Sequence, residues 1–326
     1  MQHCDDAYAA MLLTLSLSAD REEFAHPLST AEFRALDADL RENTGRGPGQ
    51  LLGKDISGIM QLLQTPEPEA LRLFTLLNRS VQLTYILESF ADDNIEVITQ
   101  YDSRYPRRLL QRLGESAPPV FYAAGHPELL NQPMLGVCGI SGVKTSPVVR
   151  ASVERIVSEA RRLSYAVATG GELGVAHLAT EKVVLAEEGN IVRFLGGGLR
   201  EFAKTPEFIR LYLQGRGLAI SLEHPDALFT VSHAAARNRL LFALSEAAFV
   251  FNTDGKRGEL EALRGRLCDY IYAWNGYPGN QPLISRGALP FGSAETLDFN
   301  DLKRHWLSSR SEQLSLFDIL DEQPED

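Results

Sequence analysis

Residues 135–170 read LGVCGISGVKTSPVVRASVERIVSEARRLSYAVATG, two short apolar runs joined by an amphipathic segment. The runs Leu135 to Cys138 and Tyr165 to Thr169 have the length and composition of buried strands. Between them, Val148 to Leu163 repeats apolar residues at helical spacing. A strand, a helix and a second strand in this order predict parallel pairing through a right-handed crossover.

The same alternation continues on both sides of this unit. A second helical segment is expected over Glu172 to Glu187. The remaining expected strands are Val120 to Ala123, Ile191 to Leu195, Leu218 to Leu222, Ala248 to Asn252 and Tyr270 to Trp274. We therefore predict an α/β fold, a doubly wound Rossmann-like parallel sheet.

The chain before this sheet has helical periodicity from Asp5 to about Asn94, with a helix start at Ser29 or Thr30. After Phe291 the periodicity fades into a polar, acidic terminus. We predict three parts: a small helical domain over 1–100, a Rossmann-like domain over 101–295, and a disordered tail over 296–326.

Composition limits the kind of function. The net charge of −11, from 32 basic and 43 acidic side chains, argues against a surface that coats nucleic acid, so any DNA site must be a local basic pocket. The three cysteines, Cys4, Cys138 and Cys268, form no metal-binding or redox pair, and the sequence predicts no metal or cofactor. We expect a cytoplasmic protein with no membrane span, because no run of 18 apolar residues occurs.

Glycine-rich turns follow three of the expected strands. They are Gly139 to Gly142, which includes Ser141; Thr169 to Gly174, which includes Gly170 and Gly171; and Gly196 to Gly198. Ligands bind at this edge of a doubly wound sheet, and glycine lets a backbone approach a phosphate closely. Each turn alone also fits a purely structural role, and none matches a dinucleotide fingerprint or a phosphate-binding P-loop.

The segment Arg237-Asn238-Arg239 lies in a helix-forming stretch. Two arginines around an asparagine suit a phosphodiester, which arginine binds bidentately, while the amide bonds a base or sugar. The structural alternative is a solvated arginine face on an ordinary helix.

Several motifs, taken in order, resemble the DNA-processing protein A family (DprA, also called Smf) over residues 101 to 290. The family's Tyr-Pro-x-x-Leu, Pro-Pro-x-Leu, glycine and Leu-Leu are similar to the segments at Tyr105, Pro118, Gly125 and Leu129. Its later motifs resemble segments here that include Thr169 to Ala176, Ser221 to Pro225, Arg237 to Arg239 and Asn280 to Ala288. The order of the whole set is more specific than any single motif.

This resemblance implies a Rossmann-like fold that binds single-stranded DNA, forms dimers and hands DNA to the RecA recombinase in natural transformation or repair, without catalysis. The sequence departs from the family at Ser141, where the family has a pocket arginine, and at Ala176, Thr180 and Arg257 to Glu259. Lys144, Lys256 and Arg257 are neighbouring cations that we expect to compensate.

A rival hypothesis keeps the fold and makes the chain a nucleotide-binding or nucleotide-hydrolysing protein, like the lysine-decarboxylase-like phosphoribohydrolases. The segment most similar to their motif, Gly170 to Gly174 followed by Glu181, lacks its proline and threonine and has a different spacing. The sequence therefore favours DNA binding over nucleotide hydrolysis.

The acidic terminus contains Gln313-Leu314-Ser315-Leu316-Phe317. This pentapeptide resembles the motif by which bacterial repair proteins dock on the β sliding clamp, in which a flexible tether carries a few apolar anchors into a preformed groove. The alternative is that Leu314, Leu316 and Phe317 pack on this chain's own core.

Overall fold

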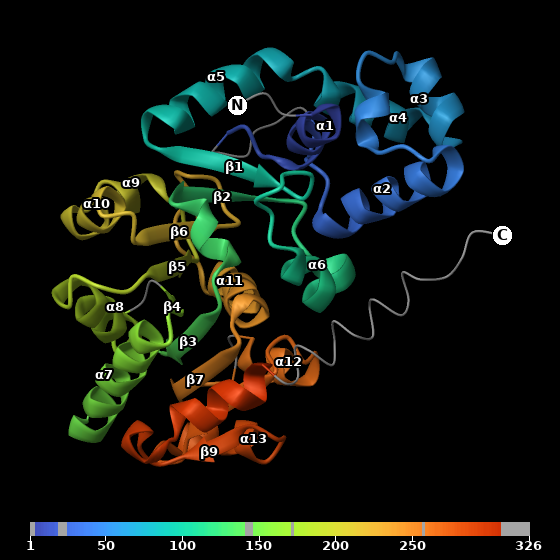
Figure 1. Ribbon diagram of the computed structural model, residues 1–326. Helices are drawn as coiled ribbons and strands as arrows, with labels where there is room; N and C mark the ends of the chain where they lie inside the picture. The colour runs from blue at the N-terminus through green and yellow to red at the C-terminus, as the bar shows by residue number, and fades with distance from the viewer. Residues whose placement is uncertain (1–3, 19–24, 141–145, 171–172, 256–257, 308–326) are drawn as a thin grey trace.

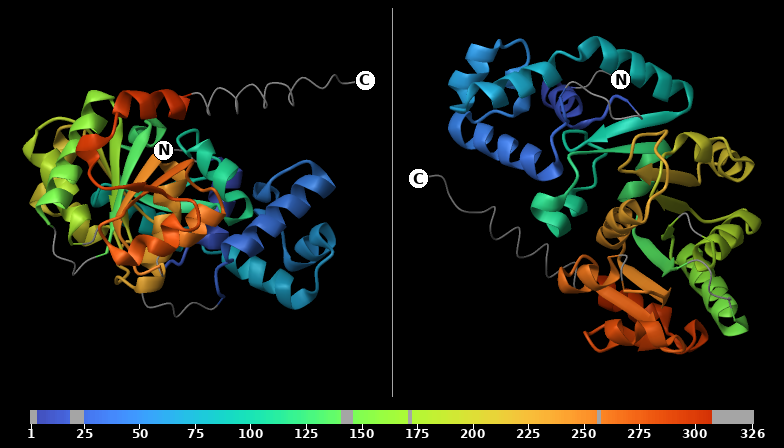
Figure 2. Two further views of the ribbon diagram at one scale, coloured as in Figure 1. Left: turned by 90° about the horizontal axis from the view of Figure 1, so that it is seen from below. Right: turned by 180° about the vertical axis from the view of Figure 1, so that it is seen from behind.

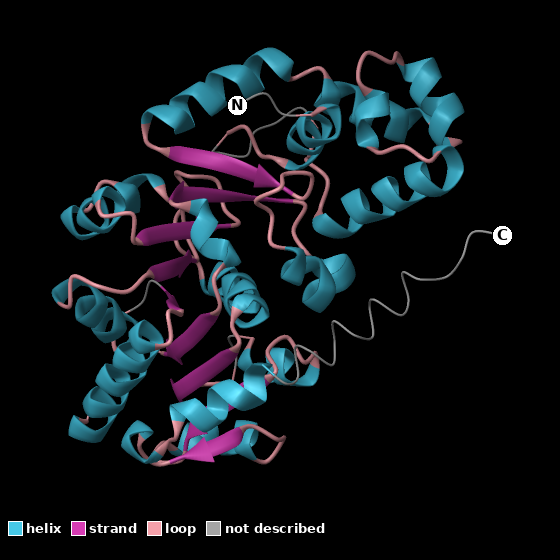
Figure 3. Ribbon diagram, in the orientation of Figure 1, coloured by secondary structure: helices cyan, strands magenta, loops and turns pink. Residues whose placement is uncertain are grey.

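The computed structural model describes residues 4–18, 25–140, 146–170, 173–255 and 258–307 (Figure 1). One twisted sheet runs through it (Figure 3). It has nine strands in the order β1-β2-β6-β5-β4-β3-β7-β8-β9. The strands are β1 (Ile95–Thr99), β2 (Val120–Gly125), β3 (Met134–Gly139), β4 (Ala166–Gly170), β5 (Ile191–Leu195), β6 (Gly217–Ser221), β7 (Ala247–Asn252), β8 (Tyr270–Trp274) and β9 (Leu289–Phe291). The sheet is mostly parallel with helices around it, which confirms the predicted α/β class.

The pairing departs from the prediction at one end of the sheet. From β6 to β9 all neighbours are parallel, but β2 is antiparallel to both β1 and β6. The expectation of parallel pairing is therefore wrong for the strand at Val120. For the β1–β2 pair the physical reason is the connection, because α6 (Arg107–Leu113) and short turns return the chain in the opposite direction beside β1.

Sequence reasoning placed seven strands to within two residues and missed β1 and β9. β1 directly follows a long helical segment, so the short strand pattern of β1 was not distinguished from the helical pattern before it. β9 is three residues long, contains Pro290 and lies at the sheet edge, where a strand tolerates proline.

Helices cover both faces of the parallel strands (Figures 1 and 2). On one face, α7 (Pro147–Arg162) and α8 (Val175–Leu185) bury Val153, Ile156 and Leu178 against β3 and β4. On the other face lie α6, α11 (Val231–Leu244) and α12 (Glu259–Arg264), which bury a second apolar cluster. Three short helices complete this part: α9 (Arg200–Ala203), α10 (Pro206–Leu213) and α13 (Gln281–Ile284).

The N-terminal part consists of α1 (Asp5–Thr14), α2 (Thr30–Thr44), α3 (Ile56–Leu63), α4 (Glu67–Leu77) and α5 (Ser80–Asp92). Ser29 caps α2 as expected: its hydroxyl accepts from the Glu32 N–H, and the Glu32 carboxylate accepts from the Ser29 N–H at 2.7 Å. The apolar core of these helices continues onto β1 and β2 through Val97 and Tyr122. The domain boundary at residue 100 remains a prediction, and β1 joins the segment before it to the sheet.

The end of the described chain is packed rather than extended. Residues 299–307 are helical, and Phe299 and Trp306 are each 2% exposed. The Trp306 ring lies 6.1 Å from that of Tyr165. The predicted disordered tail over 296–326 therefore begins with an ordered helix, because two aromatic side chains bury themselves on the sheet, and residues 308–326 lie outside the described residues.

Within the described ranges, no helix has the length and apolar character needed to span a membrane. The same residues contain no group of three histidine, cysteine or acidic side chains arranged to hold a metal ion.

Candidate functional site

The strand order creates a switch point beside β3. From β3 the chain builds β4, β5 and β6 outward in one direction, and it then returns to place β7 on the other side of β3. The connections that leave β3 and β7 therefore diverge at the carboxyl ends of these strands, where doubly wound folds bind their ligands. Of the residues expected here, Ser141, Gly142, Lys144, Gly171, Lys256 and Arg257 lie outside the described residues.

Gly139 ends β3 at this crevice, where backbone and side chains are tightly packed. The Asn252 amide donates to the Ile140 carbonyl at 3.0 Å, and the Ile140 N–H donates to the Asn252 carbonyl at 3.2 Å. A Cβ on Gly139 would lie 2.4 Å from Val175 Cγ2 and 2.5 Å from Asn252 Oδ1. Gly139 is therefore required for packing, because only glycine lets α8 and β7 approach β3 so closely.

The turn after β4 also has a structural role. The Thr169 hydroxyl is fully buried and donates to the Val137 carbonyl at 3.1 Å, so its side chain is turned away from any ligand. Gly174 has a φ of +88° and precedes the first residue of α8, a conformation that favours glycine. This turn explains why α8 begins at Val175, three residues later than the sequence predicted.

The third glycine turn is covered by the loop between β6 and α11. A Cβ on Gly198 would lie 2.0 Å from the Pro225 carbonyl oxygen, and the Ser221 hydroxyl donates to the Gly197 carbonyl at 2.7 Å. This loop presents Leu228 and Phe229, which are 86% and 54% exposed. Sequence reasoning missed both, because an apolar residue in a loop carries no signal that it faces solvent.

The three residues of the Arg-Asn-Arg segment point in different directions, since neighbours on a helix are separated by about 100°. Arg237 is 2% exposed, and its guanidinium donates to the Phe194 carbonyl at 2.7 Å and the Ala234 carbonyl at 3.2 Å. Burial of this kind does not fit the predicted direct contact of Arg237 with phosphate. Asn238 and half-buried Arg239 border two different cavities.

Asn238 borders a narrow cavity at the carboxyl ends of β3 and β4, which Gly139, Gly170 and Glu259 also line. The structure thus brings together one polar residue of α11 and two of the predicted glycine turns. The thiol of Cys138 lies in the same lining, and burial, aided by the negative charge of Glu259, raises its pKa. Cys138 is therefore a protonated thiol and a poor nucleophile.

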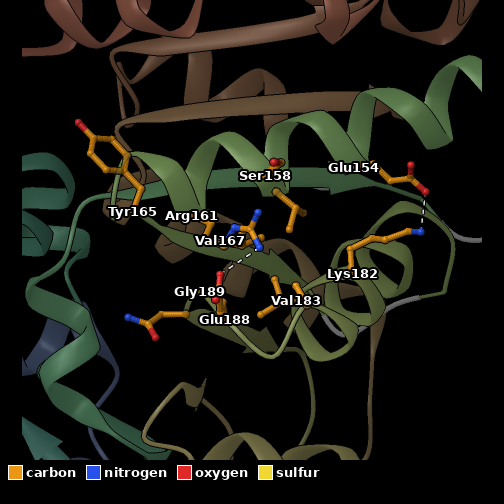
Figure 4. A pocket seen from close by; sticks show the side chains of 12 residues that line it. Glu154, Ser158, Arg161, Tyr165, Val167, Lys182, Val183, Glu188 and Gly189 are labelled. Atoms are coloured by element: carbon orange, nitrogen blue, oxygen red, sulfur yellow. Dashed lines mark hydrogen bonds and ion pairs between the residues drawn. The ribbon is translucent and has the colours of Figure 1, made fainter.

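Another cavity lies at the opposite, amino-terminal ends of β4 and β5, between α7 and α8 (Figure 4). Two ion pairs lie along it: Lys182 Nζ is 2.5 Å from Glu154 Oε1, and Arg161 Nη1 is 3.1 Å from Glu188 Oε2. Its cations are thus already paired with carboxylates, and it contains none of the residues predicted to bind a ligand.

Comparisons with known proteins agree with this geometry. The model of the family described as DNA recombination-mediator protein A matches residues 96–281. The X-ray structure of DNA processing protein A (DprA) from Streptococcus pneumoniae has a TM-score of 0.59 at 18% identity, and the match covers 83% of this chain and 99% of that one. A structure of DNA processing protein A from Helicobacter pylori, whose title concerns its single-stranded DNA binding mode, has a TM-score of 0.51 at 19% identity, covering 64% of this chain and 96% of that one.

No curated protein matches this chain. The family match covers more than half of the chain, β1 to η4 (Pro278–Asn280), and includes the switch point and its glycine turns. It confirms the resemblance drawn from the order of the motifs, and the chain belongs to the DNA recombination-mediator protein A family.

Proposed function

We propose that this protein binds single-stranded DNA at the carboxyl edge of its parallel sheet and acts, without catalysis, as a mediator of DNA recombination. The observation that carries the proposal is the switch point beside β3, where Gly139, Gly170 and Asn238 line one cavity at the carboxyl ends of the strands. In the sequence, Lys144 falls between β3 and α7, and Lys256 and Arg257 fall between β7 and α12. These three cations take the place of the pocket arginine that the family has at Ser141.

The surroundings of the crevice suit a single strand better than a duplex. A protein with a net charge of −11 repels an extended polyanion, so the attraction must be local. Exposed Phe229, which lies beside Gly196 and Gly197 after β5, offers a face on which an unpaired base stacks, whereas the bases of a duplex are already stacked on one another. The binding of single-stranded DNA named for the Helicobacter pylori protein is consistent with this assignment.

Arg237 has a supporting role in this proposal. Its bonds to the Phe194 and Ala234 carbonyls hold α11 against the end of β5, which places Asn238 beside Gly139 and Gly170. In this proposal Arg237 does not touch DNA and instead positions the helix that carries Asn238.

The partners follow from the family and from the tail. We propose that the protein is cytoplasmic, forms a homodimer and transfers its DNA to the RecA recombinase in natural transformation or repair. Gln313 to Phe317 would dock on the β sliding clamp.

The test is fluorescence anisotropy of a labelled oligodeoxynucleotide, single-stranded or duplex, titrated with protein across a salt series. We expect preference for the single strand and an affinity that falls with salt, with a slope reduced by about 0.7 for each phosphate contact removed. Lys256→Ala/Arg257→Ala should show that reduction, and Arg46→Ala/Arg264→Ala, which removes two exposed arginines elsewhere, should not.

Equal affinity for both DNA forms, or no binding at low salt, would refute the proposal. Release of a free base from nucleoside monophosphates would instead favour the nucleotide-hydrolysing alternative.

A further inference from the structure

A cavity of about 260 Å³ lies between α2, α6 and α11. Its walls are largely apolar and include Leu113, Pro118, Leu222 and Leu240. This volume is close to the lower end of the range for pockets that hold small organic ligands, and apolar walls with a few polar groups are typical of such pockets. The cavity matches the dimensions and character of a nucleobase with its sugar.

The cation at this cavity is available for a ligand. Arg239 lines it and is half-buried, and across the described residues Arg239 makes no hydrogen bond or ion pair. This distinguishes it from Arg237, which is held by backbone carbonyls. A half-buried guanidinium without a counter-ion is suited to a phosphate, which it binds with two parallel hydrogen bonds.

The cavity also lies beside the crevice at the carboxyl edge. Leu222 directly follows β6, and Pro118 precedes the antiparallel neighbour β2, so both lie at that edge. A Cβ on Gly258, the residue before α12, would be 3.8 Å from Asn238 Cβ and 3.9 Å from Arg239 Cγ. Asn238 and Arg239 point about 100° apart, so single-stranded DNA that reaches both must pass around α11.

We infer that this cavity is a nucleotide subsite, in which Arg239 binds a phosphate of the single strand and the apolar walls enclose the adjoining base. The inference rests on the proposed function and extends its site across α11. The strand enters at the crevice between β3 and β7 and turns one base into the cavity.

The polar rim of the cavity gives the subsite a base preference. Glu115 lies in the lining, and like Arg239 it forms no hydrogen bond or ion pair with a described residue. A carboxylate accepts a hydrogen bond from the exocyclic amine of cytosine, which thymine lacks. The subsite therefore prefers cytosine to thymine.

The experiment compares oligodeoxycytidylate with oligothymidylate by anisotropy for three cavity variants and one control. Arg239→Ala should weaken binding by on the order of tenfold and lower the salt slope by about 0.7. Ala31→Trp, which fills the cavity from the exposed start of α2, should weaken binding by on the order of tenfold and leave the slope unchanged. Glu115→Gln should reduce the preference for cytosine, and Arg264→Ala, an exposed arginine on α12, should bind as wild type.

Thermal melting of each variant checks that the fold is intact, and Arg239→Lys, which retains the charge, should recover most of the salt slope. If the wild type binds single strands and both Arg239→Ala and Ala31→Trp bind equally well, the subsite is refuted while the proposed function stands. If the wild type binds no single strand, both proposals fail.

Discussion

At the level of single residues, burial decides what a charged side chain does. Arg237 and Arg239 are two positions apart on α11, and the sequence presents them as equivalent phosphate ligands. The structure buries Arg237 on the backbone of β5 and leaves Arg239 at the rim of a cavity. The sequence identifies the Arg-Asn-Arg segment but does not show which arginine is buried, because that depends on which face of α11 packs on the sheet.

The two arginines should therefore respond differently to truncation. Arg237→Ala should lower the free energy of unfolding by about 2–3 kcal/mol, since it leaves a buried carbonyl without its charged donor. Arg239→Ala should change it by less than about 0.5 kcal/mol, as a partly exposed residue without bonds does. Urea denaturation of both variants measures the difference, and equal stability would contradict the assigned roles.

Phe229 should act on binding and not on stability. Phe229→Ala removes a stacking face and should weaken binding of a single strand by about 1–3 kcal/mol, with the salt slope unchanged. Tyr85→Ala is the matched control, because Tyr85 is an aromatic residue 70% exposed on α5. If the Phe229→Ala variant binds single strands with unchanged affinity, no base stacks on Phe229.

At the level of elements, α2 is held at its start by charge as well as by its cap. Glu32 closes the capping box and accepts from Arg72 of α4 at 2.8 Å. The hydrogen bond from Arg72, together with those from Ser29, lowers the pKa of Glu32 to about 2 although burial opposes the shift. The folded state therefore binds a proton to this carboxylate more weakly than the unfolded chain does.

This shift gives α2 a pH dependence with a definite sign. Because the pKa is depressed on folding, the stabilising contribution is present above about pH 4.5 and is lost as the pH falls toward 2. The stability difference between wild type and Glu32→Gln should shrink over that range, and the partial exposure of Glu32 keeps it small. Denaturant titrations at several pH values test this, with Glu42→Gln, at an exposed position of the same helix, as control.

For the whole molecule, the proposed DNA site and the end of the described chain lie at opposite ends of the strands. Trp306 contacts Tyr165 and Tyr270, which stand at the amino ends of β4 and β8. The glycine turns and the crevice are at the carboxyl ends.

Removal of residues 308–326 should separate the two proposed interactions. We expect the truncated protein to keep its stability and its affinity for single strands, and to lose binding of the β sliding clamp measured by calorimetry. Full-length protein with Gln313→Ala/Leu316→Ala/Phe317→Ala should behave like the truncation. Clamp binding that persists in both would refute docking through this segment, and a large loss of stability would favour packing of Leu314, Leu316 and Phe317 on the core.

The sequence alone determined the α/β class, seven of the strands, the start of α2 and the family. Those features are set by local patterns, by the period of apolar residues and by the order of motifs along the chain. Gly139 could be recognised from its glycine-rich turn, and Arg237 from the Arg-Asn-Arg segment.

Only the tertiary structure decided the antiparallel end of the sheet, the burial and contacts of the individual candidate residues and the exposure of Phe229. Each of these depends on contacts between residues far apart in the chain: Arg237 on β5, Gly139 on α8 and β7, and Trp306 on β4 and β8. A sequence pattern specifies which side chains an element carries. Whether each one faces the core, a cavity or solvent depends on the neighbours that the fold supplies.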